Sequence, residues 1–121
     1  MSFFVLKNRI HLTRGDSAEI DLTIRDRVTG SVFILGDGDR LIFTLKRFIT
    51  DKEPVLTKSL GQGIRQEQER YVLHFRPEDT QSMACGRYVY EMKLMRKNGY
   101  TDTFIPARDF FLERSVMGHG T

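Results

Sequence analysis

The sequence has few of the residues from which reactive or metal-binding centres are built. Its 121 residues include one cysteine, Cys85, and no tryptophan. A single cysteine excludes an intramolecular disulfide and a zinc site made of several cysteines. The three histidines, His11, His74 and His119, lack the spacing of metal ligands, so we predict no metal and no cofactor. No apolar run approaches the roughly 18 residues that a transmembrane helix needs, so we predict no membrane partner.

The sequence also lacks a strong excess of charge of either sign. The 19 basic and 16 acidic residues give a formal net charge of +3 and alternate along the whole chain. The longest basic clusters are the pairs Lys46-Arg47 and Arg96-Lys97, whereas nucleic-acid-binding surfaces concentrate basic residues on one face. We therefore predict no nucleic-acid partner. The apolar N-terminal segment is followed by basic residues without a small-residue cleavage site, so we predict no secretion signal.

The pattern that is present is that of β-strands. In residues 18–24, apolar side chains alternate with Glu19, Asp21 and Thr23, and a period of two places alternate side chains on opposite faces of a strand. Seven to nine short strands with almost no helix predict an all-β fold, an antiparallel sandwich or a barrel. We expect a single domain over residues 1–121, with its core at about 9–116 and peripheral ends at 1–8 and 117–121. The other expected strands are 9–13, 31–35, 41–46, 55–60, 71–75, 88–95, 100–105 and 109–113.

Turn-forming residues separate these segments. Gly15 permits a tight turn after the first strand. Asn98 and Gly99 both tolerate positive φ, so they predict a type I′ hairpin turn. Pro106 predicts a strand end or a bulge because it has no backbone N–H. Pro77 predicts the opening of a short helical turn over residues 78–84.

One constellation favours the sandwich over the barrel. Asp79 and Thr80 precede Gly86, and Tyr88 and Tyr90 follow on one face of the same strand. In immunoglobulin-like sandwiches a tyrosine at this place turns its hydroxyl back to the backbone of the preceding corner. We predict this role for Tyr88; the alternative is an ordinary core strand with two tyrosines.

Tyr90 falls where antibody domains have their second core cysteine. The fold therefore does not depend on a disulfide, and cohesion must come from aromatic packing between the sheets. The residues that we expect to provide it are Phe43, Phe75, Tyr90, Phe104 and Phe110.

No catalytic residues are predicted. A cysteine nucleophile needs a histidine base and an orienting acid in a cleft, and Cys85 has no such local motif. We expect Cys85 to be a small buried or half-buried residue and His74 to lie on the solvated face of its strand. Asp37 and Asp39 resemble the start of an EF-hand loop, but the later ligands and the glycine of that loop are missing.

The order of several short motifs carries a family resemblance. The first motif is Arg14-Gly15-Asp16 followed by Ser17; its match to the integrin-binding tripeptide is attributed to turn geometry. An Asp/Gly-containing turn and a strand ending in lysine come next. A Pro-x-Asp-Thr corner and a Gly-x-Tyr-x-Tyr strand follow, here Pro77, Asp79, Thr80, Gly86, Tyr88 and Tyr90. In this order the motifs resemble the immunoglobulin-like modules of tailed-phage tail proteins, particularly the N-terminal domain of baseplate upper proteins and related prophage proteins, over about residues 10–116.

The resemblance implies a non-enzymatic structural or assembly protein of a phage or prophage particle, located in the virion or in the host cytoplasm during assembly. Its partners would be other phage structural proteins and other copies of itself, with no small-molecule substrate. The apolar ends lie outside the periodic strands, and we expect them to contribute to oligomeric or ring contacts. These end residues are Phe3, Phe4, Val5, Leu6, Val116 and Met117.

Three alternatives remain open from the sequence. A carbohydrate- or ligand-binding sandwich would need a groove lined by exposed Tyr71 or Tyr100. A small enzyme would need a pocket that joins Cys85 to a histidine. A secreted adhesion module would need a route out of the cell, for which no signal is predicted.

Overall fold

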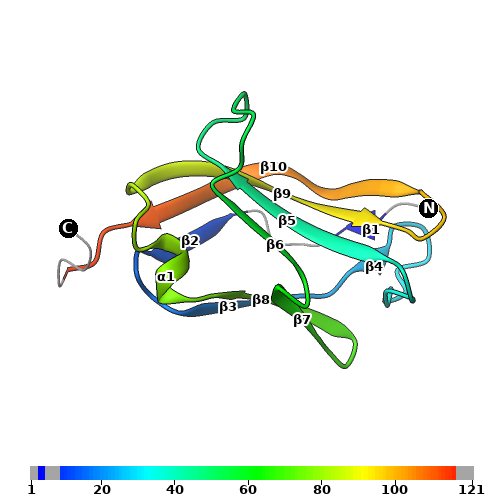
Figure 1. Cartoon of the computed structure of the whole chain (residues 1–121). Coiled ribbons are helices and arrows are strands. Elements are labelled where there is room, and N and C mark those ends of the chain that lie inside the picture. Colours follow the sequence, from blue (N-terminus) through cyan, green and yellow to red (C-terminus); the bar gives the residue numbers. More distant parts are fainter. Residues whose placement is uncertain (1–2, 5–8, 117–121) are drawn as a thin grey trace.

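Strands dominate the computed structural model, which describes residues 3–4 and 9–116 (Figure 1). Two of the long strands, residues 40–46 and 86–95, alternate buried with partly exposed side chains, as their apolar period of two predicts. The elements are β1 (Phe3–Phe4), β2 (Ile10–Thr13), β3 (Ala18–Leu22), β4 (Arg25–Asp26), β5 (Arg40–Lys46), β6 (Leu56–Leu60), β7 (Gly63–Glu67), β8 (Arg70–Phe75), α1 (Pro77–Thr80), β9 (Gly86–Met95) and β10 (Thr101–Glu113).

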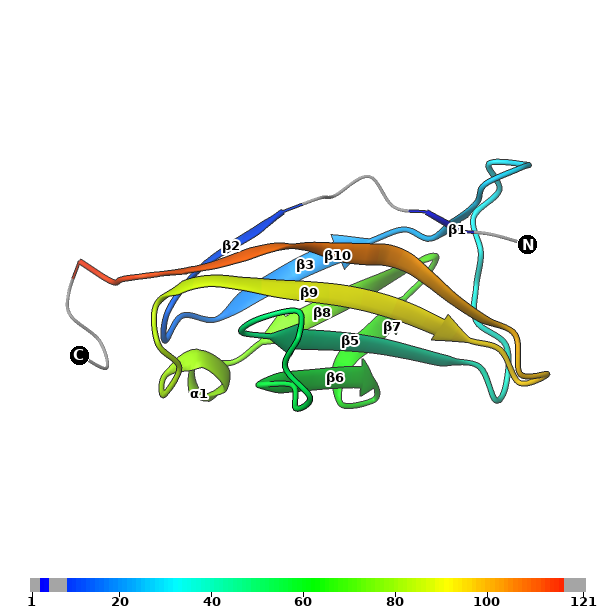
Figure 2. The same cartoon turned by 90° about the horizontal axis from the view of Figure 1, so that it is seen from above.

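Eight of these strands form one continuous sheet that folds over into two layers (Figures 1 and 2). The strand order is β2-β10-β9-β5-β6-β7-β8-β3, and β1 pairs separately with β4. One layer holds β2, β10, β9 and β5, and the other holds β7, β8 and β3. The sheet passes from the first layer to the second at β6 and β7, which pair in parallel. The layered strand order is that of an immunoglobulin-like β-sandwich.

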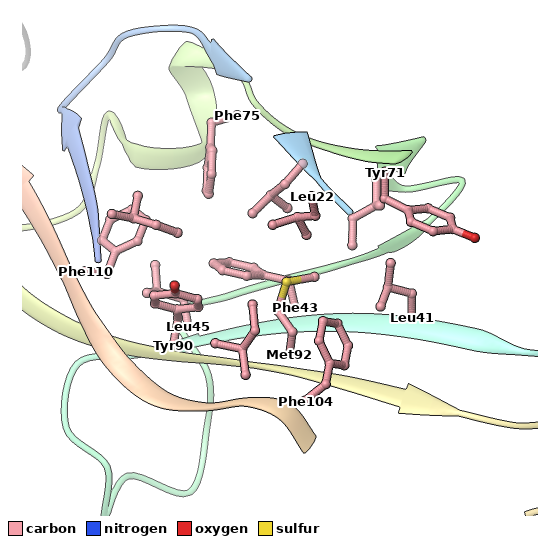
Figure 3. Packing of buried hydrophobic residues seen from close by; sticks show 14 of the residues in the cluster. Leu22, Leu41, Phe43, Leu45, Tyr71, Phe75, Tyr90, Met92, Phe104 and Phe110 are labelled. Carbon is pink, nitrogen blue, oxygen red and sulfur yellow. The ribbon is translucent and has the colours of Figure 1, made fainter. Parts of the chain in front are cut away.

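Aromatic side chains from both layers fill the space between them (Figure 3). The ring of Phe43 on β5 meets the edge of Phe75 on β8, with 5.7 Å between their centroids. Phe75 lies 5.8 Å from Phe110 on β10, and Tyr90 lies 5.7 Å from Phe43. Phe104 completes the set of five that the sequence predicted, and all five are buried. Non-covalent ring contacts therefore connect the two layers, whereas an antibody domain has a disulfide between its sheets.

Residues 31–35 and β7 are among the segments that differ from the sequence-based expectation. Residues 31–35 do not form a strand, because only Val32 makes an isolated bridge, to Arg25. Conversely, β7 was not expected from its sequence, in which Ile64 is the only buried residue and most of the others are polar. It forms because it pairs with β8, where Ile64 lies opposite Leu73.

The hairpin between β9 and β10 forms where Asn98 and Gly99 predicted it, but the type I′ assignment is wrong. Gly99 has φ +94°, whereas Asn98 does not have positive φ. The Gly99 N–H donates to the Arg96 carbonyl at 2.9 Å, and the Arg96 N–H donates to the Tyr100 carbonyl at 2.7 Å. The loop therefore has three residues, beginning at Lys97, and needs the left-handed conformation only at Gly99.

Pro106 lies in a bulge of β10, one of the positions in a sheet that its missing N–H allows. The register of β10 against β9 shifts between Ile105 and Arg108. The two segments predicted on either side of Pro106 therefore form one bent strand and not two.

Candidate functional site

Motif residues that are distant in sequence meet at the end of the sandwich that carries α1 (Figure 1, left). Gly15 has φ +83°, which turns the chain between β2 and β3. The Gly15 N–H donates to Thr80 Oγ1 at 2.9 Å, and Thr80 is fully buried. Arg14 donates from Nη1 to the Met83 carbonyl at 3.3 Å. We call this cluster, with the start of β9, the motif corner.

The helical turn α1 is shorter than the expected 78–84, and Asp79 holds it to the sheet. Pro77 opens the turn, and the Arg76 N–H donates to Asp79 Oδ2 at 2.8 Å. Lys58 of β6 brings its Nζ to 2.7 Å from the same oxygen, and both side chains are buried. Burial alone raises the pKa of Asp79, but the Arg76 N–H and the Lys58 ammonium outweigh it and lower that pKa below its usual value.

Tyr88 closes the motif corner with the hydrogen bond that the sequence predicted. Its hydroxyl donates to the Ala84 carbonyl at 2.6 Å. The Arg47 guanidinium lies over the Tyr88 ring, 4.7 Å from its centroid. Gly86 has φ +138°, and a Cβ there would lie 2.8 Å from Arg47 Nη1. The glycine therefore both permits the backbone conformation and makes room for the arginine.

Replacing Tyr88 with phenylalanine is expected to lower the free energy of unfolding by about 1 kcal/mol, because it removes one hydrogen bond and keeps the ring. Urea denaturation monitored by near-UV circular dichroism measures this change. A Tyr88→Leu variant, which also loses the ring contact with Phe110 at 6.3 Å, is expected to lose more. Equal stability of Tyr88→Phe and the wild type would contradict the corner's role.

The remaining motif residues have backbone or packing roles. The Asp16 N–H donates to the Thr13 carbonyl at 3.1 Å within the first turn. Tyr90 is a core residue, and Asn98 with Gly99 forms the hairpin loop away from the motif corner. Within residues 3–4 and 9–116, no group of three or more histidine, cysteine, aspartate or glutamate side chains is placed to hold a metal ion.

Asp39, one of the two aspartates that resemble the start of an EF-hand loop, anchors the hairpin loop between β9 and β10. Its carboxylate accepts the Gly36 N–H and the Lys97 N–H, both at 2.9 Å, and Arg96 Nε at 3.2 Å. The hydrogen bond from Gly36 is the main reason that the pKa of Asp39 is lowered from its usual value. The buried carboxylate joins two loops through hydrogen bonds from three donors, which is a structural role.

Two of the three histidines, His11 and His74, and the cysteine lie among the described residues, whereas His119 lies outside them. His11 stacks on Phe111 with 4.8 Å between centroids, and its Nδ1 lies 2.9 Å from Glu113 Oε1. His74 is half-exposed on the outer side of β8, 3.4 Å from Glu19, in agreement with the expected solvated face. Cys85 is half-buried with a free thiol.

Tyr71 cannot line the exposed aromatic groove that a carbohydrate-binding sandwich would need. Its ring is fully buried, and its hydroxyl accepts the Leu35 N–H at 2.8 Å. Burial raises the pKa of the Tyr71 hydroxyl. Only Tyr100 of the two tyrosines named for that function is exposed, at 41%.

The apolar ends that we expected to make oligomeric contacts are only partly described. The backbone of Phe3 and Phe4 forms β1, which pairs antiparallel with β4. Val116 is fully exposed after β10. Val5, Leu6 and Met117 lie outside the described residues.

A surface that sequence reasoning missed lies on the outer side of β9 and β10, next to the loop that follows β5. Phe48 and Ile49 on this loop are 60% and 67% exposed. They border a hollow of about 590 Å³ that we call the outer groove. Its lining residues are Arg47, Phe48, Ile49, Thr50, Arg87, Val89, Ala107, Arg108 and Asp109. The signal in the sequence is the apolar pair directly after Lys46-Arg47, beyond the end of the alternating pattern of β5.

The fold and these surfaces define an immunoglobulin-like β-sandwich module with an exposed groove lined by both apolar and charged side chains. No protein-family model matches the sequence, and no curated protein matches it. In structure it is similar to CopC from Methylosinus trichosporium OB3b, with 11% identity, a TM-score of 0.48, and 93% of this chain and 94% of that one covered. It is also similar to the titin immunoglobulin tandem domains A164-A165, with 10% identity and a TM-score of 0.47. That match covers 95% of this chain and 51% of the titin chain.

Helical structure contributes little to the described part of the chain. None of its helices has the length and apolar character needed to cross a membrane.

Proposed function

We propose that this chain is a non-enzymatic structural module of a phage or prophage particle that acts through protein–protein contacts. The observation that carries the proposal is the outer groove, where a structured loop presents Phe48 and Ile49 to solvent beside a hollow. Large apolar side chains gathered at one exposed place are typical of interaction sites. The partners we propose are other structural proteins of the particle and further copies of this chain.

The assignment to a phage particle is supported by the order of the sequence motifs. The contacts at the motif corner bring these motifs together in the folded chain. The Arg14-Gly15 turn needs Thr80, and the corner that contains Thr80 is closed by Tyr88. Motifs that pack together in this way constrain one another and define one structural module. The apolar ends remain a proposed second contact between copies.

The test is whether the chain travels with particles. After prophage induction in the strain that encodes the chain, lysates are separated on a density gradient and probed with an antibody against it. We expect the chain to co-sediment with tail structures at a constant ratio to another tail protein. Recovery of the chain only among free proteins would contradict the proposal.

A further inference from the structure

The loop that borders the outer groove is held in a defined shape. It stands above the layer of β5, β9 and β10, at the top of Figure 1. Asp51 Oδ2 accepts the Phe48 N–H at 3.0 Å, and the Asp51 N–H donates to the Phe48 carbonyl at 3.0 Å. Lys46 Nζ donates to the Asp51 carbonyl at 2.7 Å. Because these bonds order the loop, binding to its apolar side chains costs less conformational entropy than binding to a free loop would.

The outer groove combines an apolar wall with basic groups. Val89 and Ala107 line it together with the exposed Phe48 and Ile49. Three guanidinium groups line it as well, and the only carboxylate among its lining residues is that of Asp109.

The charges of the outer groove do not cancel. Asp109 is already engaged, since Arg87 Nε lies 2.9 Å from its Oδ1. Arg87 nevertheless remains 67% exposed, and Arg47 and Arg108 have no second carboxylate among the lining residues. The groove therefore complements a ligand that has both apolar groups and negative charge.

We propose that the outer groove binds a short segment of another protein chain in which carboxylates stand next to apolar side chains. This inference rests on the proposed function and names the chemistry of the partner. Arginine binds carboxylates with paired hydrogen bonds, and apolar side chains in the hollow would cover Phe48 and Ile49. A second copy docked by a two-fold axis through this face would instead place the same arginines opposite one another, and like charges oppose such a contact.

The proposal is tested with the full chain labelled with ¹⁵N and three hexapeptides. The first alternates aspartate with phenylalanine, the second replaces each phenylalanine with serine, and the third replaces each aspartate with lysine. We expect the first peptide alone to shift the amide signals of Val89, Ala107 and the loop residues 47–50. Ile49→Ser and Arg108→Glu are each expected to weaken that binding about tenfold or more.

A matched control is Val28→Ser, because Val28 is 87% exposed but does not line the outer groove. It is expected to leave peptide binding unchanged, and unchanged urea midpoints would show that all variants fold.

The proposal is overturned if the serine or lysine peptide binds equally well, if shifts map to another surface, or if only a single-stranded oligonucleotide binds these residues. Concentration-dependent shifts without peptide that Ile49→Ser removes would instead identify a second copy as the occupant. None of these results decides the proposed function, because the co-sedimentation of the chain with particles is measured separately from peptide binding.

Discussion

Replacing Phe43 with alanine is expected to reduce the free energy of unfolding by about 3–5 kcal/mol. Phe43 is fully buried and contacts both Phe75 and Tyr90, so its removal leaves a cavity between the two layers. The layers have no disulfide to hold them together, and Cys85 is free. The ring contacts therefore provide cohesion that no covalent bond replaces. Equilibrium denaturation in urea measures the loss as a lower midpoint.

Phe48→Ala is the matched control for this change. It removes the same side chain from a site that is 60% exposed, so we expect less than about 0.5 kcal/mol of destabilisation. Similar losses for the two variants would show that the aromatic cluster of Figure 3 does not carry the stability that its burial implies.

Replacing Lys58 with methionine is expected to cost about 3 kcal/mol, the low end of the range for breaking a buried ion pair, because the buried Asp79 carboxylate loses its ammonium partner but keeps Arg76, whose Nη2 lies 3.5 Å from Oδ1. The methionine keeps much of the apolar stem that lies beside Phe75, since Lys58 Nζ is 5.4 Å from that ring. A double variant, Lys58→Met with Asp79→Leu, is expected to recover part of the loss because no buried charge remains. It does not recover all of it, because the Arg76 N–H loses its acceptor at α1.

The pH dependence of the Lys58→Met variant gives a second readout. The pKa of Asp79 is lowered in the folded wild type, so its contribution to stability is present above the ordinary aspartate value and is lost as pH falls through the folded-state pKa. The difference between wild type and variant is therefore largest near pH 7 and narrows below about pH 4. A difference that is constant from pH 7 to pH 3 would contradict this account. As a control, Arg87→Met breaks an exposed ion pair and is expected to cost much less.

Most of the sandwich could be predicted because its strands are buried on one face only. That arrangement produces the period of two in β5 and β9, which identified the core aromatics. The Tyr88 corner was predicted instead from the place of Tyr88 at the start of β9, after Asp79, Thr80 and Gly86. The pattern fails where a strand buries little of its own surface. Ile64 alone anchors β7, so the pairing of that strand with β8 is a tertiary effect.

The other departures arise from contacts that no local pattern encodes. The hairpin loop at Asn98 takes its register from Asp39, which accepts the Lys97 N–H from a distant part of the chain. Lys58 stands between threonine and serine in the sequence, and its burial depends on Asp79 of α1. The outer groove requires β9, β10 and the loop after β5 to be adjacent. The apolar pair Phe48-Ile49 beyond the end of β5 is visible in the sequence, but its place beside a groove follows only from this adjacency.

The most direct test of the account is particle association of the chain and its groove variants. In a strain whose own copy is deleted, the wild type, Val28→Ser and the double variant Phe48→Ser/Ile49→Ser are each expressed during prophage induction, and particles are separated on a density gradient. We expect the wild type and Val28→Ser to co-sediment with tail structures, and the double variant to remain with the free protein. Equal recovery of the double variant in particles, or absence of the wild type from them, would contradict the proposed role of the outer groove in the particle.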